Sequence, residues 1–350
     1  MARSGRISKS LLAGMVMAAS VLVGVAPADA QGTATVLLSG LSSPKGLATA
    51  PGDSLLIGQG AFGPPGPILR HMVDSGDTVE ITEPVNVTDV APGRGSGWAL
   101  SEGTLYRFDR RGSLTPVADI PAYQETDPDP EDLEDFPTES NPYGLAALPS
   151  GDALVADAAG NDLLRITPRG QITTVARFDV EIVSTDHLPP DFGLPPQMPT
   201  ESVPTGVTVG SDGFVYVGEL KGFPFRPGSS KVWKIDPDAE GALCSTTTPG
   251  PSCSRAAGGF TAIQDIAIDL ANRSLYVYEF AAGGILEFES GFGTGEFPPA
   301  VLLKVTGANE RTELVAGELS EPGGVAVDGN GDVYVTDGLF SEGRLLQIQE

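Results

Sequence analysis

The sequence predicts an all-β protein, a six-bladed β-propeller closed by an N-terminal strand that completes the last blade. Three observations carry this prediction. A strand-and-turn unit recurs six times, its second strand is apolar on both faces, and the segment 33–46 resembles the strand that the last copy lacks. Four-stranded sheets stacked face to face around an axis meet all three conditions.

The first 30 residues are typical of a secretory signal peptide. A basic start is followed by an uncharged apolar stretch over 11–26 and by a small-x-small cleavage site at 28–30. The apolar stretch is shorter than the about 20 residues that cross a bilayer, so a cleaved leader is favoured over a retained anchor. We therefore expect residues 31–350 to form one propeller domain in a secreted or periplasmic protein, with no membrane span after cleavage.

One spacing defines the repeated unit. Thirteen residues lead from the glycine of a Pro-x-Gly turn, or from its stand-in, to an acidic or amide side chain. The six pairs are Gly46–Gln59, Asp89–Glu102, Gly144–Asp157, Gly206–Glu219, Ile266–Glu279 and Gly324–Asp337. A spacing shared by six segments indicates six equivalent structural units.

Each copy continues with a third strand-like run, and most copies with a fourth. The third runs are 68–73, 104–109, 162–167, 231–236, 301–306 and 344–349, and the fourth runs are 77–82, 113–118, 171–176 and 312–317. They are rich in Val, Ile, Leu, Thr and Tyr and are bounded by turn residues, which is typical of strands. No helical period follows the signal, so no helix is expected in the mature chain.

The second strand of the unit indicates how the sheets pack. In the stretch 214–220, Val215 and Val217 lie on one face while Phe214 and Tyr216 lie on the other. A sheet with one face in water would alternate apolar and polar residues. Apolar residues on both faces therefore predict sheets that are covered on both sides.

The ends of the mature chain indicate how the ring closes. The segment 33–46 aligns without gaps on 311–324, the fourth strand that leads into the last copy, and the last copy stops after its third strand. The first strand should therefore complete the sixth sheet, which removes an exposed edge.

The chain resembles the ScyD/ScyE family, most specifically at 140–166 and 203–235, where "GELKGFPF" (218–225) is the most distinctive piece. These are exported propellers of the NHL and gluconolactonase-like kind, some of them associated with scytonemin pigment biosynthesis. The resemblance covers essentially the whole mature chain. It implies a fold and an export route, and it supplies no reaction.

The resemblance also indicates which residues face the central channel. In such propellers the residue before the repeat glycine points toward the axis, and the gluconolactonase-like relatives hold a divalent metal there with Asn, Asp and Glu. The corresponding positions here are Lys45, Thr88, Tyr143, Thr205, Asp265 and Gly323. Only Asp265 is a plausible ligand and Lys45 would oppose a cation, so no cofactor is expected, and a divalent metal such as calcium is the less favoured alternative.

The acidic and amide side chains at the thirteen-residue spacing allow two interpretations. Glu102, Asp157, Glu219, Glu279 and Asp337, with Gln59, could form an acidic rim that captures a cation or a cationic ligand. Alternatively, they accept turn N–H groups or pair with the basic residues of the third strands, for which Arg107, Arg165 and Lys234 are suitably placed. The second interpretation is favoured because side chains repeated in every unit usually serve the unit.

Two further local features concern the loops. Cys244 and Cys253, close together in an exported chain, predict a disulfide. Long irregular inserts at 123–140, 184–202, 221–230 and 291–299 are candidate functional loops. In the first, Asp127, Asp129, Glu131 and Asp132 could bind calcium, although the EF-hand glycine and spacing are absent. In the third, Phe223 and Phe225 could form an apolar patch or pack on a neighbouring loop.

The charge and the motifs narrow the function classes. The chain has 46 carboxylates against 21 Lys and Arg, which argues against nucleic-acid and anionic-membrane partners. His71 and His187 stand apart from any recognisable nucleophile motif. The leading hypothesis is a binding or scaffold module that presents a loop rim to a small molecule or a protein. The alternatives are a lactonase- or esterase-type hydrolase at the channel mouth, using Asp265 with Lys45 and Tyr143, and a purely structural extracellular protein.

Overall fold

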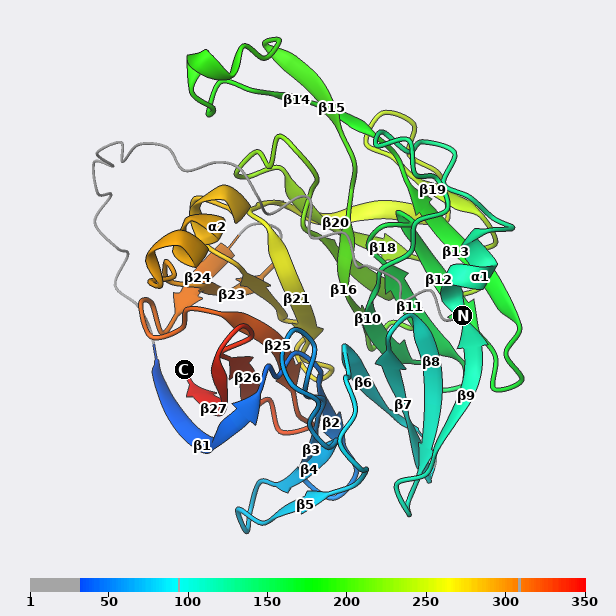
Figure 1. Ribbon diagram of the computed structural model, residues 1–350, viewed down its shortest axis with the longest axis vertical. Helices are drawn as coiled ribbons and strands as arrows, with labels where there is room; N and C mark the ends of the chain where they lie inside the picture. Colours follow the sequence, from blue (N-terminus) through cyan, green and yellow to red (C-terminus); the bar gives the residue numbers. More distant parts are fainter. Residues whose placement is uncertain (1–31, 94, 308–309) are drawn as a thin grey trace, which may run out of the picture.

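The computed structural model describes residues 32–93, 95–307 and 310–350. Six sheets, each built on four antiparallel strands, surround a central axis, which confirms the six-bladed β-propeller (Figure 1). The expected signal peptide, residues 1–30, lies outside the described residues. No helix within the described ranges has the length and apolar character needed to span a membrane.

Blades 1 to 3 follow one another along the chain, each with its first strand at the axis. Blade 1 contains β2 (Leu47–Ala50), β3 (Ser54–Ile57), β4 (Leu69–Met72) and β5 (Thr78–Glu80). Blade 2 contains β6 (Asp89–Gly93), β7 (Ser96–Ser101), β8 (Thr104–Asp109) and β9 (Leu114–Asp119). Blade 3 contains β10 (Pro142–Ala147), β11 (Ala153–Asp157), β12 (Asp162–Ile166) and β13 (Ile172–Phe178), with β19 (Ala242–Cys244) added parallel to β13 as a fifth strand.

Blades 4 to 6 complete the ring. Blade 4 contains β16 (Pro204–Val209), β17 (Val215–Glu219), β18 (Ser230–Ile235) and β20 (Cys253–Phe260). Blade 5 contains β21 (Ile263–Ile268), β22 (Leu275–Glu279), β23 (Val301–Thr306) and β24 (Glu310–Leu314). Blade 6 contains β25 (Pro322–Val327), β26 (Val333–Asp337), β27 (Glu342–Gln349) and β1 (Thr33–Ser42).

The ring is closed by the N-terminal strand, as predicted. β1 pairs antiparallel with β27 from Thr33 opposite Gln349 to Ser42 opposite Glu342. Figure 1 shows the two strands side by side, blue against red. The pairing gives the last blade its fourth strand and leaves β27 with a neighbour on each side.

The core lies between the blades. Apolar clusters fill the spaces between neighbouring sheets: the cluster between blades 3 and 4, for example, joins Leu154 to Trp233, and the one between blades 6 and 1 joins Tyr334 to Leu55. Every residue of β11, β22 and β26 is buried, which agrees with second strands covered on both faces. Phe214 departs from this pattern, because it precedes β17 and is partly exposed.

The expectation of a chain without helices is wrong. α1 (Ile120–Gln124) is a single turn whose N-cap Asp119 accepts a hydrogen bond from the Ala122 N–H. α2 (Ile285–Thr294) lies in the loop that follows β22. Ile285, Phe288 and Phe292 have helical spacing and hold α2 against an aromatic cluster, but two glycines within the helix hid this short period in the sequence.

The disulfide between Cys244 and Cys253 is confirmed, and it connects two blades. Cys244 ends β19, the added strand of blade 3, and Cys253 begins β20, the fourth strand of blade 4. The sequence did not predict β20, because its stretch "CSRAAGGF" is poor in β-branched residues. The bond therefore covalently links the outer strands of two neighbouring sheets.

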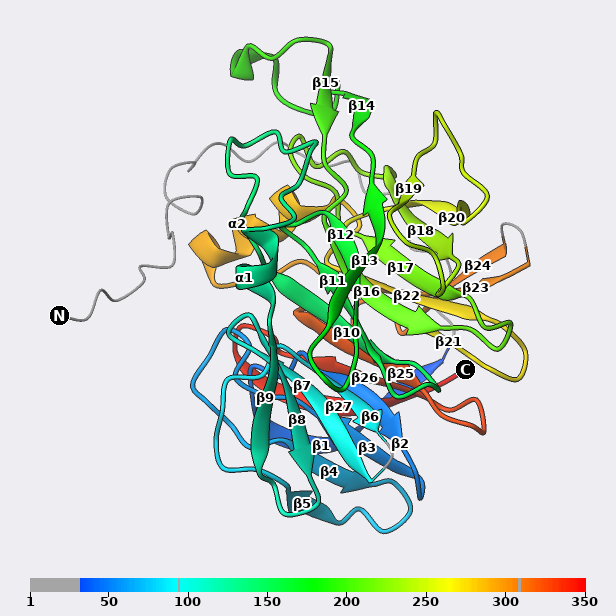
Figure 2. The same cartoon turned by 90° about the vertical axis from the view of Figure 1, so that its right-hand side faces the viewer.

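The long inserts gather at one end of the ring, which we call the insert face. First strands begin and second strands end at this face, as Pro142 opposite Asp157 shows. The inserts 119–141, 179–202, 220–229 and 280–300 all follow a second strand or precede a first strand. Figure 2 shows α1 and α2 on its left-hand side, and in both views the ribbon of β14 (Glu181–Ser184) and β15 (Gln197–Thr200) projects beyond the blades.

Replacing both cysteines by alanine should weaken the fold measurably. The bridge closes a loop with a sequence separation of 9, so the chain-entropy model predicts a loss of about 2–3 kcal/mol in the free energy of unfolding. Urea denaturation of the oxidised protein and of C244A/C253A measures the loss. Added reductant should destabilise only the parent protein; an equal response of both proteins would contradict the role given to the bond.

Candidate functional site

The channel mouth at the insert face is filled by polar side chains from different blades. Lys45, Tyr143 and Thr205 are buried at the position before the repeat glycine, and Thr88 is half-buried there. The Lys45 Nζ donates to the Tyr143 carbonyl oxygen at 2.7 Å and lies 4.1 Å from the centre of the Tyr143 ring. A cation placed over an aromatic face is an attractive contact, so the two side chains fix one another.

Tyr143 spans the channel. Its hydroxyl donates to Gln264 Oε1 at 2.8 Å, so the side chain of blade 3 reaches blade 5 across blade 4. Thr205 donates to the Ile263 carbonyl oxygen at 2.7 Å. Lys45, Asp89, Tyr143, Gln264 and Asp265 together are the channel cluster, and all five side chains are buried or nearly so.

Asp265 does not occupy the position before the repeat glycine, where the sequence pattern placed it; Gln264 does. Asp265 pairs with Tyr278, just as Gly206 pairs with Gly218, so Asp265 stands at the glycine position and Gln264 before it. The cause is the hairpin 269–274, which is one residue longer than the equivalent hairpin 210–214. The thirteen-residue spacing in blade 5 was therefore counted from Ile266, one residue past the correct position. Hairpin length was the signal that could have revealed Gln264.

Blade 2 shows a similar shift at its second strand. Ser101 pairs with Thr104 across a two-residue turn, and Ser101 occupies the strand end that Asp157 occupies in blade 3. Glu102 lies in that turn, exposed, with a positive φ of 47°. Glu102 therefore stands apart from the other thirteen-spaced residues, and its equivalence to them is a wrong prediction.

Asp89 and Asp265 clip neighbouring blades together. Asp89 Oδ2 accepts the Leu145 N–H of blade 3 at 2.8 Å, and Asp265 Oδ2 accepts the Val325 N–H of blade 6 at 2.9 Å. At Gly144, in contrast, a Cβ would lie 2.2 Å from the Thr205 carbonyl oxygen. Two blades thus use a carboxylate where the others bring backbones into direct contact.

The channel cluster buries two carboxylates around one ammonium group. Burial raises the pKa of Asp265 to about 7, while the Lys45 ammonium opposes the shift. Burial also raises the pKa of Asp89, and Lys45, 3.8 Å from its Oδ2, again opposes the shift. Removal from water disfavours the charged carboxylates, and the single ammonium offsets only part of that effect.

A divalent metal does not fit this channel mouth. The Lys45 ammonium lies 3.8 Å from Asp89 Oδ2, where it would repel a cation, and the Asp89 and Asp265 carboxylates both accept backbone N–H groups. Within the described ranges, no three His, Cys, Asp or Glu side chains are grouped to hold a metal ion. These channel positions therefore do not form the Asn, Asp and Glu ligand set that the resemblance would require.

The remaining thirteen-spaced carboxylates lie inside the protein and organise the loops before each first strand. Asp157 Oδ1 accepts the Asn141 N–H at 2.6 Å, Glu279 Oε1 accepts the Thr261 N–H at 2.7 Å, and Asp337 Oδ1 accepts the Ser320 N–H at 3.0 Å. Gln59 Oε1 accepts the Ser42 N–H at 2.9 Å in the same way. Because these groups are buried, they do not form an open acidic rim.

Basic partners of these carboxylates differ from those the sequence suggested. Lys231 lies 3.2 Å from Glu219, and Arg344 lies 2.7 Å from Asp337. The three predicted partners bind elsewhere: Arg165 contacts Asp238, Lys234 contacts Asp212, and Arg107 donates to Ser96. Lys231 and Arg344 stand near the start of the third strand rather than in its middle, and Glu219 also contacts Lys221 of the insert 220–229 at 3.3 Å.

The carboxylates of the acidic insert 123–140 contact other groups of this chain. Asp127 pairs with Arg177 at 2.5 Å, and Asp129 accepts a hydrogen bond from Asn161 Nδ2 at 3.1 Å. Asp132 accepts the Phe136 N–H at 2.8 Å. These carboxylates diverge toward separate partners, so the structure does not bring them together as calcium ligands.

The two histidines and the phenylalanines of 221–230 have structural contacts. His71 is buried, its Nδ1 lies 2.9 Å from Thr78 Oγ1, and burial lowers its pKa. His187 Nε2 lies 2.9 Å from the Pro224 carbonyl oxygen, which ties the projecting ribbon to the insert of blade 4. Phe223 and Phe225 contact one another edge to face.

An aromatic cluster joins blades 5, 6 and 1 at the insert face. Phe288 of α2 lies at its centre, 4.8 Å from Phe297 and 5.7 Å from Phe340 between ring centroids. Phe340 in turn lies 5.0 Å from Phe62, across the seam where the ring closes. Phe62 and Phe292 remain substantially exposed, so this cluster presents apolar surface beside the channel mouth.

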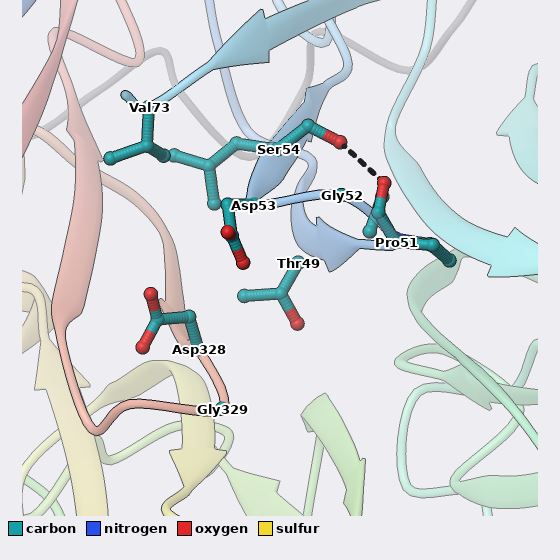
Figure 3. Close-up of a pocket in the computed structure, with 10 residues that line it drawn as sticks. Thr49, Pro51, Gly52, Asp53, Ser54, Val73, Asp328 and Gly329 are labelled. Carbon is teal, nitrogen blue, oxygen red and sulfur yellow. Dashed lines mark hydrogen bonds between the residues drawn. The ribbon is translucent and has the colours of Figure 1, made fainter.

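Cavities occur at the opposite face, between blades. One, of about 300 Å³, lies between blades 1 and 6 and is lined by residues including Thr49, Ser54, Val73 and Asp328. Figure 3 shows Asp53 of blade 1 and Asp328 of blade 6 on opposite sides of it. A second, of about 270 Å³, lies between blades 4 and 5.

Solved structures of other proteins share this fold over nearly its whole length. A glucose dehydrogenase is 16% identical, with a TM-score of 0.55 over 91% of this chain and 99% of its own. A virginiamycin B lyase from Staphylococcus aureus is 16% identical, with a TM-score of 0.51 over 90% and 99%. A PQQ-bound aldose sugar dehydrogenase from Streptomyces coelicolor is 14% identical, with a TM-score of 0.51 over 91% and 98%.

These similarities show a six-bladed propeller fold and no more, because identity is low throughout. The three proteins are enzymes of different chemistry, and neither their substrates nor the PQQ cofactor of one of them can be assigned to this chain. No protein-family model matches the sequence, and no curated protein matches it.

Neutralising Glu279 should stabilise the protein most at alkaline pH. Burial raises the pKa of Glu279 from 4.5 to about 8, so the folded state holds a proton that the unfolded state loses between these values, and stability falls as pH rises through that window. Glu279→Gln keeps an oxygen for the Thr261 N–H and should gain on the order of 2–4 kcal/mol at pH 9, with little gain at pH 4. Chemical denaturation at both pH values measures the difference; a pH-independent gain would contradict this account.

Removing the Tyr143 hydroxyl should destabilise the propeller, although the aromatic side chain would still occupy the channel. Tyr143→Phe retains the ring beneath Lys45 and leaves Gln264 Oε1 without its donor, a loss of about 1–2 kcal/mol. Thermal or urea unfolding measures it, with Tyr106→Phe as a control at an outer strand. An unchanged stability would show that the bond between blades 3 and 5 contributes nothing.

Proposed function

We propose that this protein is an exported propeller of the ScyD/ScyE kind that binds a ligand or partner at its insert face and performs no chemistry in its channel. The observation that carries the proposal is that four long inserts, 119–141, 179–202, 220–229 and 280–300, gather at one face of a closed ring. Loops positioned by a rigid scaffold are the usual place for recognition. The channel mouth itself is occupied by side chains that hydrogen-bond to one another and to neighbouring backbone groups.

Charge supports a positively charged partner. The inserts 119–141, 179–202, 220–229 and 280–300 carry 17 carboxylates and two basic side chains, with nine of the carboxylates in the first insert. Burial and the neighbouring Glu139 and Asp132 raise the pKa of Glu134, and burial followed by Glu134 raises that of Glu201. Crowded carboxylates of this kind attract cationic groups and steer their approach.

Apolar side chains stand among these charges. In the acidic insert Leu133 is 45% exposed and Phe136 is 66% exposed. A hydrogen bond holds the insert against the base of the projecting ribbon: the Leu133 N–H donates to Glu201 Oε1 at 2.6 Å. A ligand with both a cationic group and an apolar surface therefore matches this side of the insert face best.

The alternative, a lactonase- or esterase-type hydrolase at the channel mouth, lacks a specific supporting observation. Such chemistry needs a nucleophile with a base in reach, or a metal-bound water. Lys45, Tyr143 and Asp265 are instead hydrogen-bonded to the Tyr143 carbonyl oxygen, the Gln264 amide and the Val325 N–H, respectively. Export remains part of the proposal, supported by the leader-like sequence and by the disulfide.

A cationic amphiphile should bind this surface and an anionic one should not. Dodecyltrimethylammonium and dodecyl sulfate, each below its micelle concentration, are the probes, and isothermal titration calorimetry is the measurement. The L133S/F136S and D132N/E134Q/D135N variants should each bind the cationic probe at least tenfold more weakly than the parent protein. Salt at 0.5 M should also weaken this binding.

The matched control is D152N/D328N, which removes two carboxylates from hairpins at the opposite face. It should leave binding unchanged. Equal binding of both amphiphiles, or equal loss in the control variant, would show that the insert face has no such preference.

A further inference from the structure

The hairpin between the first two strands of blade 5 carries an arginine where three other blades carry a glycine. In those hairpins the residue whose N–H returns to the start of the turn is Gly151, Gly213 or Gly331, with φ of 99°, 82° and 92°. In blade 5 it is Arg273, with φ of 65°, whose N–H donates to the Asp269 carbonyl oxygen at 2.8 Å. A side chain in the left-handed region is strained, so this position presents an arginine at a conformational cost.

Arg273 lines the cavity of about 270 Å³ between blades 4 and 5, on the face opposite the inserts. Blade 4 contributes Asp212, Tyr216 and Lys234 to the lining. Ile268, Leu275 and Val305 of blade 5 form its apolar wall, with two alanines of β20 on the other side. An apolar pocket with a few convergent polar groups is the usual form of a small-molecule site.

The charges in this cavity do not balance. Lys234 Nζ lies 2.6 Å from Asp212 Oδ2, and the Tyr216 hydroxyl donates to the same oxygen at 2.9 Å, so that pair is neutral. Arg273 has no ion-pair partner among residues 32–93, 95–307 and 310–350. The cavity therefore carries one uncompensated positive charge in a chain whose net charge is −25.

We propose that this cavity binds a small carboxylate with an apolar body. The planar guanidinium of Arg273 presents paired donors that match a carboxylate, and the apolar body would lie along Ile268, Leu275 and Val305. The volume of about 270 Å³ suits a short chain or a single ring. The site is separate from the insert face and does not depend on the function proposed there.

Binding of hexanoate, hexanamide and hexylamine to the full protein tests the proposal, with calorimetry or saturation-transfer NMR as the measurement. Hexanoate should bind, and the neutral and cationic analogues should bind at least tenfold more weakly. Arg273→Gly introduces the residue that three other blades use, so the variant should fold at least as stably as the parent protein and bind hexanoate at least tenfold more weakly. Arg273→Lys keeps the charge without the planar donor pair, so its affinity for hexanoate should lie between those of the parent protein and of Arg273→Gly.

Arg110→Gly, at an exposed hairpin of blade 2, is the matched control and should bind hexanoate like the parent protein. The peptide Ala-Ala-Leu with a free or an amidated C-terminus identifies the source of the carboxylate: tighter binding of the free peptide than of hexanoate assigns the site to a polypeptide C-terminus, and weaker binding assigns it to a free acid. The proposal is overturned if hexanamide equals hexanoate, if Arg273→Gly binds as well as the parent, or if millimolar hexanoate does not bind.

Discussion

Burial of both faces of every blade is the constraint on which the rest of the structure depends. A sheet with two apolar faces is stable only between two neighbours, and only a closed ring gives every sheet two neighbours. Closure brings the starts of all six first strands together around the axis. The channel cluster and the arrangement of the inserts at one face both follow from that geometry.

Much of this could be predicted from the sequence, because strand periodicity and turn residues are local signals. The spacing found the blades, and the alignment of 33–46 with 311–324 found the closing strand. In blade 5 the hairpin is one residue longer, so counting thirteen residues back from Glu279 gave the wrong position. Turn length, rather than distance along the chain, sets the register of a strand pair. Gln264 was missed for that reason, and Asp265 was given the wrong position.

The candidate site was predicted less well, because its contacts join distant parts of the chain. Lys45 meets the Tyr143 carbonyl over a separation of 98 residues, and Tyr143 meets Gln264 over 121. Spacing places a carboxylate at a strand end, yet it does not tell whether a loop covers it, as one does at Asp157 and Glu279. The aromatic cluster around Phe288 depends on three loops meeting, which no single segment reveals.

The pairing of β1 with β27 also governs when the molecule can become complete. β1 is synthesised first, but its partner β27 is synthesised last. Blade 6 therefore cannot be completed, and the apolar faces beside it cannot be covered, until nearly the whole chain is available. Contacts between such distant segments form slowly, and an unpaired edge invites association with other chains in the meantime. A propeller closed in this way therefore passes through a long open-ring stage, and its vulnerability to misassembly lies at the seam between its ends.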